Sequence, residues 1–352
     1  MRAEAFQLAI LDWFDRHGRK DLPWQSQPTP YRVWVSEIML QQTQVATVIP
    51  FFQRFMETFP ELEYLAAASQ QEVLRRWAGL GYYARARNLH KTAQIVKSEY
   101  GGQFPRDLER LTGLPGIGRS TAGAILSMAF GVRAAILDGN VKRVLSRFAG
   151  IDGWPGEVNI ARELWQISER LTPAVRVAEY TQAIMDLGAT LCTRRQPACP
   201  HCPVHAACQA FRLGKSDTLP PPRPKRILPI RQSFMLALRN GGAFYLQRRP
   251  PVGVWGGLWS FPEFEQEAEL TAWCERREID VRQLERLPER RHTFTHFHLD
   301  YIPVTGETAI SLRVEENAQT CWRKPEEENA LPTPVRQLMN ELGDSSRTPV
   351  TG

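Results

Sequence analysis

The 352-residue sequence has no apolar run long enough to cross a bilayer, and only six of its residues are cysteine. Its first twenty residues, MRAEAFQLAILDWFDRHGRK, follow an amphipathic helical pattern that Glu4, Asp12 and Asp15 interrupt. They lack the continuous apolar segment and the small-residue cleavage site of a secretory signal. No internal repeat is present. We therefore expect a cytoplasmic protein without a membrane anchor.

The excess of positive charge lies before residue 229. Residues 1–215 hold 26 Lys and Arg against 19 Asp and Glu, residues 216–228 hold three against one, and residues 229–352 hold 15 against 18. The whole chain has a net charge of +6. A basic region joined to a mildly acidic one suggests that the first faces a polyanion, although many basic surfaces only keep a protein soluble.

The hydrophobic pattern divides the chain into two domains. Apolar residues recur at helical spacing through 4–14, 33–49, 70–78, 86–98, 119–130, 140–148, 160–170 and 177–190. A linker follows at 216–229, where five prolines favour extended, semi-rigid backbone. We expect a mostly α domain over 1–215, an α+β domain over 230–342 and a loose tail over 343–352.

The second domain is predicted from a change of period. FMLALRNGGAFYLQRR (234–249) predicts two strands joined at Asn240-Gly241-Gly242. HTFTHFHLDYIPV (292–304) alternates in the same way. ELTAWCERREI (269–279) is the one stretch of this domain with a helical pattern, which makes the domain α+β.

Four of the six cysteines fall within CTRRQPACPHCPVHAAC; they are Cys192, Cys199, Cys202 and Cys208. Four thiolates can hold tetrahedral zinc or a four-iron cluster, and a reducing cytoplasm disfavours disulfides. Seventeen residues suit a compact cluster wrapped by one loop. Zinc stays an alternative, with His201 and His205 as substitute ligands. Arg194 and Arg195 could clamp a phosphate or simply belong to a solvated loop.

The stretch LTGLPGIGRSTAGAILSMAFG (111–131) predicts two helices joined by a tight hairpin. Gly116 and Gly118 are expected to adopt positive φ and leave backbone N–H groups open, and Ser120 is expected to cap the second helix. Open N–H groups at a helix N-terminus suit an anionic oxygen. A plain helix–helix turn is the alternative, but the full motif is typical of a hairpin that grips the DNA backbone.

Asp138 stands before another predicted helix, in AAILDGNVKRVLSR, where an N-cap residue belongs. A carboxylate at that position can also face a cation that develops in a cleft. Lys142 and Arg143 follow in the same helix and are natural phosphate contacts.

Glu37, in YRVWVSEIMLQQTQVATVI, has apolar neighbours at three of its four helical contact positions. Burial raises the pKa of a carboxyl and keeps it protonated, whereas a purely structural glutamate would need a buried partner. A protonated acid beside an ionised carboxylate is the arrangement that cleaves glycosidic bonds. On DNA, this chemistry predicts N-glycosidic cleavage of an extruded nucleotide.

Five motifs in one order carry a resemblance to a known family: SEIMLQQTQ, GLGYYARARNLHK, LPGIGRSTA, ILDGNVKRV and the cysteine set. With them the chain resembles the adenine DNA glycosylases of the MutY family, in the helix–hairpin–helix superfamily. The resemblance extends over nearly the whole chain. It implies removal of adenine mispaired with 8-oxoguanine or guanine in duplex DNA, and a [4Fe–4S] cluster on the four cysteines. We expect a monomer associated with the nucleoid.

The resemblance also implies the roles of single residues. Glu37 protonates the adenine ring at N7, and Asp138, with Asn140 beside it, stabilises the oxocarbenium ion. The residues expected to contact DNA are Gln41, Gln42 and Tyr82 in the base stack, Gln182 at the flipped adenine, Gly116, Gly118 and Ser120 in the hairpin, and Lys142 and Arg143.

One position departs from related bifunctional glycosylases. They carry a nucleophilic lysine two residues after the second hairpin glycine, where this chain has Ser120. Without an amine no Schiff base forms there, so we expect a monofunctional enzyme with little or no AP lyase activity.

The second domain resembles a Nudix domain that has lost its metal site. Gly257 and Glu263 have the spacing of the metal-binding box, but TAWCER (271–276) replaces the carboxylates that should follow, so pyrophosphate hydrolysis is not expected. The family's Phe-Ser-His loop touches 8-oxoguanine and reads Phe294-Thr295-His296 here. Thr295 keeps the hydroxyl group and adds a methyl group.

Two other functions remain open from the sequence. A pyrimidine-damage glycosylase with lyase activity would form a covalent adduct with DNA, which Ser120 disfavours. A non-catalytic lesion sensor would use the cluster and the second domain for binding alone, and it would not depend on Glu37.

Overall fold

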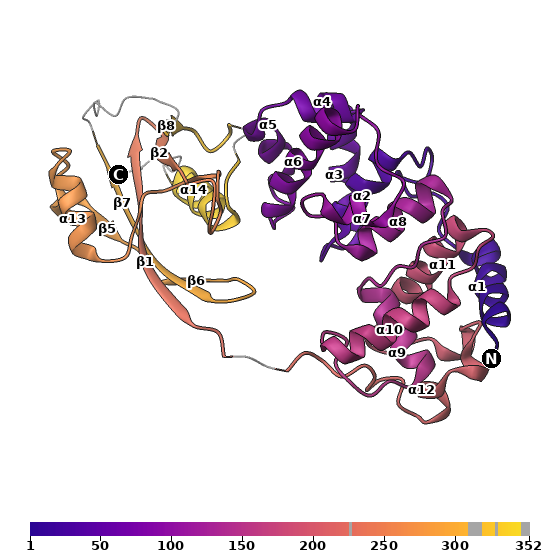
Figure 1. The fold of residues 1–352 in the computed structure, drawn as a ribbon. Coiled ribbons are helices and arrows are strands. Elements are labelled where there is room, and N and C mark those ends of the chain that lie inside the picture. Colours follow the sequence, from indigo (N-terminus) through magenta and orange to yellow (C-terminus); the bar gives the residue numbers. More distant parts are fainter. Residues whose placement is uncertain (225–226, 309–318, 328–329, 346–352) are drawn as a thin grey trace. The chain divides into compact units, whose positions relative to one another are not determined.

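The computed structural model describes residues 1–224, 227–308, 319–327 and 330–345. These residues form two compact units (Figure 1). The helical unit holds residues 1–68 and 88–224, and the second unit combines residues 69–87 with the described residues from 227 onward. The mostly α and α+β classes expected for the two parts are confirmed.

The domain boundaries drawn from the sequence stay predictions. The predicted linker at 216–229 includes residues 225 and 226, which lie outside the described residues. The predicted tail at 343–352 lies outside them from residue 346 onward. No helix in the described part of the chain is both long enough and apolar enough to span a membrane.

The described part of the helical unit consists of helices and the loops that connect them. Its helices are α1 (Ala3–His17), α2 (Pro30–Leu40), α3 (Val45–Thr58), α4 (Leu62–Ala67), α7 (Leu108–Gly113), α8 (Arg119–Phe130), α9 (Gly139–Ala149), α10 (Val158–Leu171), α11 (Val177–Thr190) and α12 (Gln209–Arg212). Two short 3-10 turns, Cys199–His201 and His205–Ala207, lie before α12. Helix α6 (Ala84–Glu99) starts in segment 69–87, and α5 (Gln70–Trp77) lies wholly within it.

The helical pattern over 33–49 is divided in the structure. Helix α2 begins at a Thr29 cap, whose hydroxyl accepts the Arg32 N–H at 3.3 Å, and has Pro30 at its first position. It ends at Leu40, and α3 begins at Val45, so a single helix over 33–49 is wrong. Gln42 between them has φ +57, which a right-handed helix cannot include. Glu37 therefore lies in the last turn of α2.

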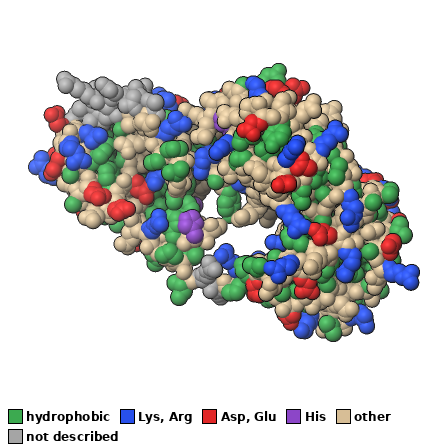
Figure 2. Space-filling model, viewed as in Figure 1, with side chains coloured by type: hydrophobic (Ala, Val, Ile, Leu, Met, Phe, Trp, Pro, Cys, Tyr) green, Lys and Arg blue, Asp and Glu red, His purple; other side chains and the backbone are tan. Residues whose placement is uncertain are grey.

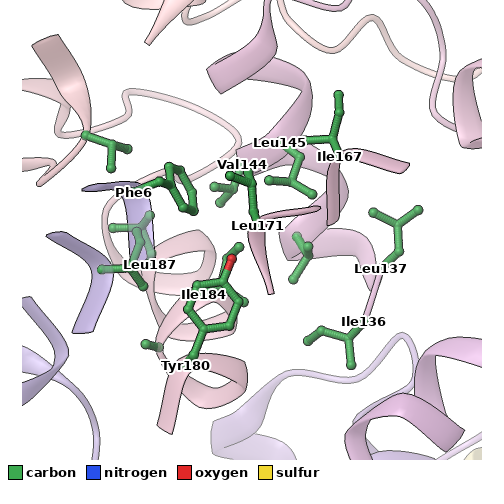
Figure 3. Close-up of a cluster of buried hydrophobic side chains, with 14 of the residues drawn as sticks. Phe6, Ile136, Leu137, Val144, Leu145, Ile167, Leu171, Tyr180, Ile184 and Leu187 are labelled. Carbon is green, nitrogen blue, oxygen red and sulfur yellow. The ribbon is translucent and has the colours of Figure 1, made fainter. Parts of the chain in front are cut away.

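A buried cluster joins the first helix to the last three long helices of this unit. Phe6 of α1, Val144 of α9, Ile167 of α10 and Ile184 of α11 all belong to it (Figure 3). Full burial of each such side chain stabilises the fold by about 1.5–3 kcal/mol. This packing holds α9, which starts directly after Asp138, against α11.

The second unit is built on one mixed sheet of eight described strands. They are β1 (Ile230–Asn240), β2 (Ala243–Arg248), β3 (Trp259–Ser260), β4 (Glu263–Phe264), β5 (Glu285–Arg286), β6 (Arg290–Thr293), β7 (His298–Glu307) and β8 (Thr320–Arg323). The order β3-β2-β1-β7-β5 places β1 and β7 side by side and parallel, while β4, β6 and β8 pair with β1, β7 and β2. The hairpin at 240–242 is confirmed, with Arg239 opposite Phe244.

Two long helices accompany this sheet, although the sequence predicts only one. Helix α13 (Glu267–Glu275) confirms the predicted helix, and Trp273 packs with Leu236 and Tyr245 of the sheet in a buried cluster. Helix α14 (Thr333–Ser345) was missed, because TPVRQLMNELGDS contains Pro, Asn and Gly. Burial of its apolar positions outweighs these weak propensities; the buried residues are Val335, Leu338, Met339 and Leu342.

Candidate active site

Glu37 projects from α2 without a polar partner. Its carboxyl makes no hydrogen bond or ion pair with any described residue, and its neighbours Val33, Trp34 and Ile38 are buried. Burial, reinforced by the Asp138 carboxylate, raises the pKa of Glu37 to about 8. The carboxyl therefore keeps its proton at neutral pH. Glu37 is not sealed off, because it stays partly exposed.

Asp138 is confirmed as the N-cap of α9, where its Oδ1 accepts the Val141 N–H at 2.8 Å. Burial raises its pKa, but the backbone N–H groups of Val141 and Asn140, and the charges of Arg143 and Lys142, act in the opposite direction. The two carboxyls are close enough for Asp138 to influence Glu37. Because only Asp138 has donors for its anion, Glu37 is the member of the pair that holds the proton.

The start of α9 is tied to α11 and to the cysteine loop. Arg143 donates through Nη2 to Asn140 Oδ1 at 2.9 Å and to the Gly188 carbonyl at 2.6 Å, and through Nε to the Cys192 carbonyl at 2.6 Å. A Cβ on Gly188 would lie 2.6 Å from that of Asn140, so the two helices need a glycine at this contact. The guanidinium of Arg143 thus serves protein acceptors, whereas the Lys142 ammonium has no partner among the described residues.

The hairpin follows the predicted order of helix, turn and helix, with two corrections. Gly116 has φ +79 as expected, but Gly118 has φ −86, so only one of the two glycines is left-handed. Gly118 is the N-cap of α8, and Ser120 lies inside the helix instead of capping it. The Ser120 hydroxyl accepts the Leu137 N–H at 3.0 Å. The hairpin is thereby fixed to the residue that precedes Asp138.

The glutamines predicted to reach DNA differ in their surroundings. Gln41 is the C-cap residue after α2, and Gln42 is exposed at the left-handed position that follows. Tyr82, in the second unit, is also left-handed and exposed. Gln182 is buried on α11, where its Nε2 donates to Asp186 at 2.7 Å and its Oε1 has no hydrogen-bond partner. Gln182 therefore presents an unused acceptor, which suits an amino group of a ligand.

The four clustered cysteines surround one recess. Cys192, Cys199, Cys202 and Cys208 all line it, together with apolar side chains of α9 and α11. Burial, followed by the three neighbouring thiols, raises the pKa of Cys202 to about 12. Such a crowded set needs a strongly cationic centre before its members become thiolates. The donor chemistry therefore fits a metal group held at this recess.

The two histidines predicted as substitute zinc ligands differ in their placement. His201 is exposed and does not line the recess, while His205 lines it but uses Nδ1 to bond the Cys202 carbonyl at 2.7 Å. In the part of the chain that the structure describes, no group of three or more His, Cys, Asp or Glu side chains is placed to hold a metal ion. Four thiols are a ligand set for zinc and for a four-iron cluster alike.

In the second unit, the segment between β6 and β7 presents Thr295 and His296 to solvent. The Phe294 N–H closes the turn on the Phe297 carbonyl at 2.9 Å. The Phe294 ring stacks on that of Phe297 at 4.5 Å and packs against Trp255 at 5.4 Å. Phe294 thus anchors the turn, and the two polar residues form its exposed tip.

The remnant of the Nudix box is occupied by an ion pair. Glu263 of β4 forms a short salt bridge with Arg249, which also donates through Nε to the Val254 carbonyl at 3.0 Å. Gly257 keeps a left-handed φ of +77. A carboxylate already neutralised by a guanidinium is a poor ligand for Mg²⁺.

Charge on the visible face of the helical unit is mixed. In Figure 2, Lys and Arg side chains are spread over this face among Asp and Glu, and no continuous basic patch is seen there. Several arginines of the helical unit pair with carboxylates, as Arg176 does with Asp15 at 2.6 Å. The net positive charge of the helical unit is therefore not concentrated on the face that Figure 2 shows.

Comparisons with known proteins agree with this geometry. Residues 35–170 match the HhH-GPD superfamily of base excision DNA repair proteins, and residues 234–341 match the NUDIX domain. The adenine DNA glycosylase of Buchnera aphidicola is 39% identical, over 96% of this chain and 97% of that protein. The human adenine DNA glycosylase is 36% identical, over 87% of this chain and 68% of that protein.

A solved structure shows the same fold for the helical unit. A thermostable thymine-DNA glycosylase superposes with a TM-score of 0.55 and 28% identity, over 60% of this chain and 97% of that one. The two sequence relatives extend far beyond this unit and include the Nudix-like part. On this evidence, the chain belongs to the adenine DNA glycosylase family.

Proposed function

We propose that the protein is a monofunctional adenine DNA glycosylase that removes adenine opposite 8-oxoguanine or guanine in duplex DNA. The observation that carries the proposal is the pair Glu37 and Asp138. The Glu37 carboxyl holds a proton with a pKa near 8, and the Asp138 carboxylate accepts a backbone N–H at a helix N-terminus, which works against the rise in its pKa that burial causes. N-glycosidic cleavage requires these two roles together.

The reaction starts with an adenine nucleotide rotated out of the duplex. Glu37 donates its proton to N7 of adenine, and the C1′–N9 bond then breaks with its electron pair passing to the purine. The cation left on the sugar is stabilised by the Asp138 carboxylate, which Asn140 adjoins. Water adds to C1′ and returns a proton to a carboxylate of the pair. The products are free adenine and an abasic site.

Binding of the nucleotide uses separate parts of the chain. Gly116, Gly118 and Ser120 place the backbone N–H groups at the start of α8 toward a phosphate. Lys142 is the better candidate for a second phosphate contact, because Arg143 is used within the protein. The Oε1 of Gln182 accepts from the amino group of adenine. Gln41, Gln42 and Tyr82 enter the base stack.

The cysteine set is proposed to hold a [4Fe–4S] cluster. Cys192, Cys199, Cys202 and Cys208 supply four thiolates around one recess, which is the ligand set of such a cluster. When bound, the cluster supplies a cationic iron core that fixes the loop over residues 192–208. No step of base removal passes through it.

The second unit is proposed to recognise the opposite base. Thr295 and His296 lie exposed at the tip of a turn that Phe294 anchors, and these two side chains contact 8-oxoguanine. The absence of lyase activity is proposed from Ser120. Its hydroxyl is occupied by the Leu137 N–H, and no amine stands at this position to attack the sugar.

The proposal is tested with a duplex that carries one adenine opposite 8-oxoguanine. With enzyme in excess, we expect release of free adenine and an abasic strand that breaks only after alkali treatment. Borohydride should trap no covalent adduct. Binding without adenine release would show a lesion sensor, and trapping of an adduct would show a lyase. Either result overturns the proposal.

A further inference from the structure

One buried arginine of the helical unit has no role in the site described above. Arg147 of α9 is only 3% exposed and makes no ion pair among the described residues. Its Nη1 donates to the Thr193 carbonyl at 2.6 Å and to Cys192 Sγ at 3.3 Å. Nη2 donates to the Arg194 carbonyl at 3.2 Å, and Nε to the Leu219 carbonyl at 2.7 Å. All three nitrogens of the guanidinium are thus used.

The acceptors are concentrated at the start of the cysteine loop. Three of the four belong to the consecutive residues 192–194, and the fourth is the carbonyl of Leu219, itself buried. The backbone carbonyl of Arg147 also lies 3.4 Å from Cys208 Sγ. One residue therefore contacts the first and the last cysteine of the set and lines the recess between them.

The charge of Arg147 points to an anionic occupant of the recess. A buried cation is costly unless a negative charge or a full set of hydrogen bonds compensates it. Here the described residues provide neutral carbonyls and one sulfur atom, but no carboxylate. Four thiolates around a [4Fe–4S] core carry a net negative charge, which would add a counter-charge to the hydrogen bonds that Arg147 makes with these neutral acceptors.

We propose that Arg147 closes the cysteine loop over the cluster, by holding residues 192–194 against α9 and donating an N–H···S hydrogen bond to Cys192. The inference rests on the proposed cluster. A closed loop slows the loss of iron. The buried charge and the hydrogen bond to sulfur stabilise the more negative, reduced cluster and so raise its reduction potential.

The role differs from that of the neighbouring arginines. Arg143, one turn earlier on α9, donates to the Cys192 carbonyl and to Asn140; its charge interacts with the Cys192 thiol, but none of its hydrogen bonds goes to sulfur. Arg195 lies in the loop itself and is exposed. The substitution Arg195→Gln therefore removes one positive charge near the cysteines without removing the contacts of Arg147, and it is the matched control.

The test uses the full chain purified without oxygen, with iron release to a chelator and the reduction potential as readouts. Outer partners of metal ligands typically contribute 10–100-fold to metal retention, so Arg147→Gln should lose iron about 10–100-fold faster than the natural protein. Its potential should fall. Arg195→Gln should stay within about twofold of the natural rate, in line with the small effects of surface substitutions.

A natural rate of iron loss and an unchanged potential in Arg147→Gln would overturn the proposal, and so would an equal effect in Arg195→Gln. If circular dichroism shows that Arg147→Gln does not fold, Arg147→Lys decides. Lysine keeps the charge but cannot reach four acceptors, so natural behaviour of that variant also overturns the proposal. Iron-free natural protein would instead refute the cluster itself.

Discussion

The two units each contain a glutamate at a position typical of a functional site, but the surroundings of these glutamates differ. In the helical unit, Glu37 has buried apolar neighbours in its helix and no cationic partner among the described residues, and the pKa of its carboxyl rises to about 8. In the second unit, Glu263 occupies the place of a metal-binding glutamate but forms a salt bridge with Arg249. One carboxyl is kept reactive, and the other is neutralised.

The difference shows how the surroundings of a carboxyl group decide whether it can donate a proton or bind a cation. A buried carboxyl without a partner destabilises the fold when it ionises. Its pKa is therefore raised, and the group still has a proton to donate at neutral pH. A carboxylate paired with a guanidinium stabilises its surroundings and loses its affinity for cations. The difference between the two glutamates can be tested by replacing each with glutamine, its neutral isostere.

The largest effect is expected from Glu37→Gln. Glutamine keeps the size of the side chain but cannot donate an acidic proton, and loss of a positioned general acid costs about 100- to 10,000-fold in rate. Single-turnover release of adenine from an 8-oxoguanine duplex measures the loss, and fluorescence anisotropy checks that DNA binding persists. Glu263→Gln is the control and should release adenine at the natural rate. Equal rates of adenine release for the two variants would show that Glu37 is not the general acid.

A smaller effect is expected from pH. The pKa of Glu37 is raised, so its protonated, active form is present below pH 8 and is lost as the pH rises through that value. The single-turnover rate should fall about tenfold per pH unit above pH 8. On the acid side the rate should decline earlier than an ordinary aspartate would require, because the pKa of Asp138 is also raised.

The pH profile has its own control. Glu37→Gln has no proton to lose at this position, so its residual rate should not show the decline above pH 8. A natural enzyme whose rate stays level between pH 7 and 9.5 would contradict a protonated Glu37. The same decline in both proteins would assign the titration to another group.

Features that depend on neighbours in the sequence could be predicted. The hairpin at Asn240-Gly241-Gly242 and the capping of α9 by Asp138 are encoded by residues within a few positions of each other. The raised pKa of Glu37 could likewise be predicted, because helical spacing alone identifies its apolar neighbours. For these elements the local pattern and the tertiary structure agree.

Features that depend on distant residues could not be predicted. The salt bridge between Arg249 and Glu263 spans 14 positions, and the contact of Arg147 with Cys192 spans 45. Such pairs leave no periodic trace in the sequence. Ser120 was expected as a helix cap for its residue type, but it faces Leu137, 17 residues later. Each of these contacts can be identified only from the three-dimensional structure.

The smallest effect is expected from breaking the ion pair of the second unit. Glu263→Gln leaves the partly buried Arg249 without its carboxylate, and this should lower the free energy of unfolding by about 1–2 kcal/mol, between the values for exposed and fully buried pairs. Calorimetry of the full chain should show a melting temperature lower by a few degrees, whereas Glu265→Gln, at an exposed position two residues away, should leave it unchanged. If Glu263 instead bound a cation, Mg²⁺ would raise the melting temperature of the natural protein and not that of Glu263→Gln. A stabilising effect of Mg²⁺ that requires Glu263 would therefore show that the second unit has kept its metal site, and the contrast with Glu37 would fail.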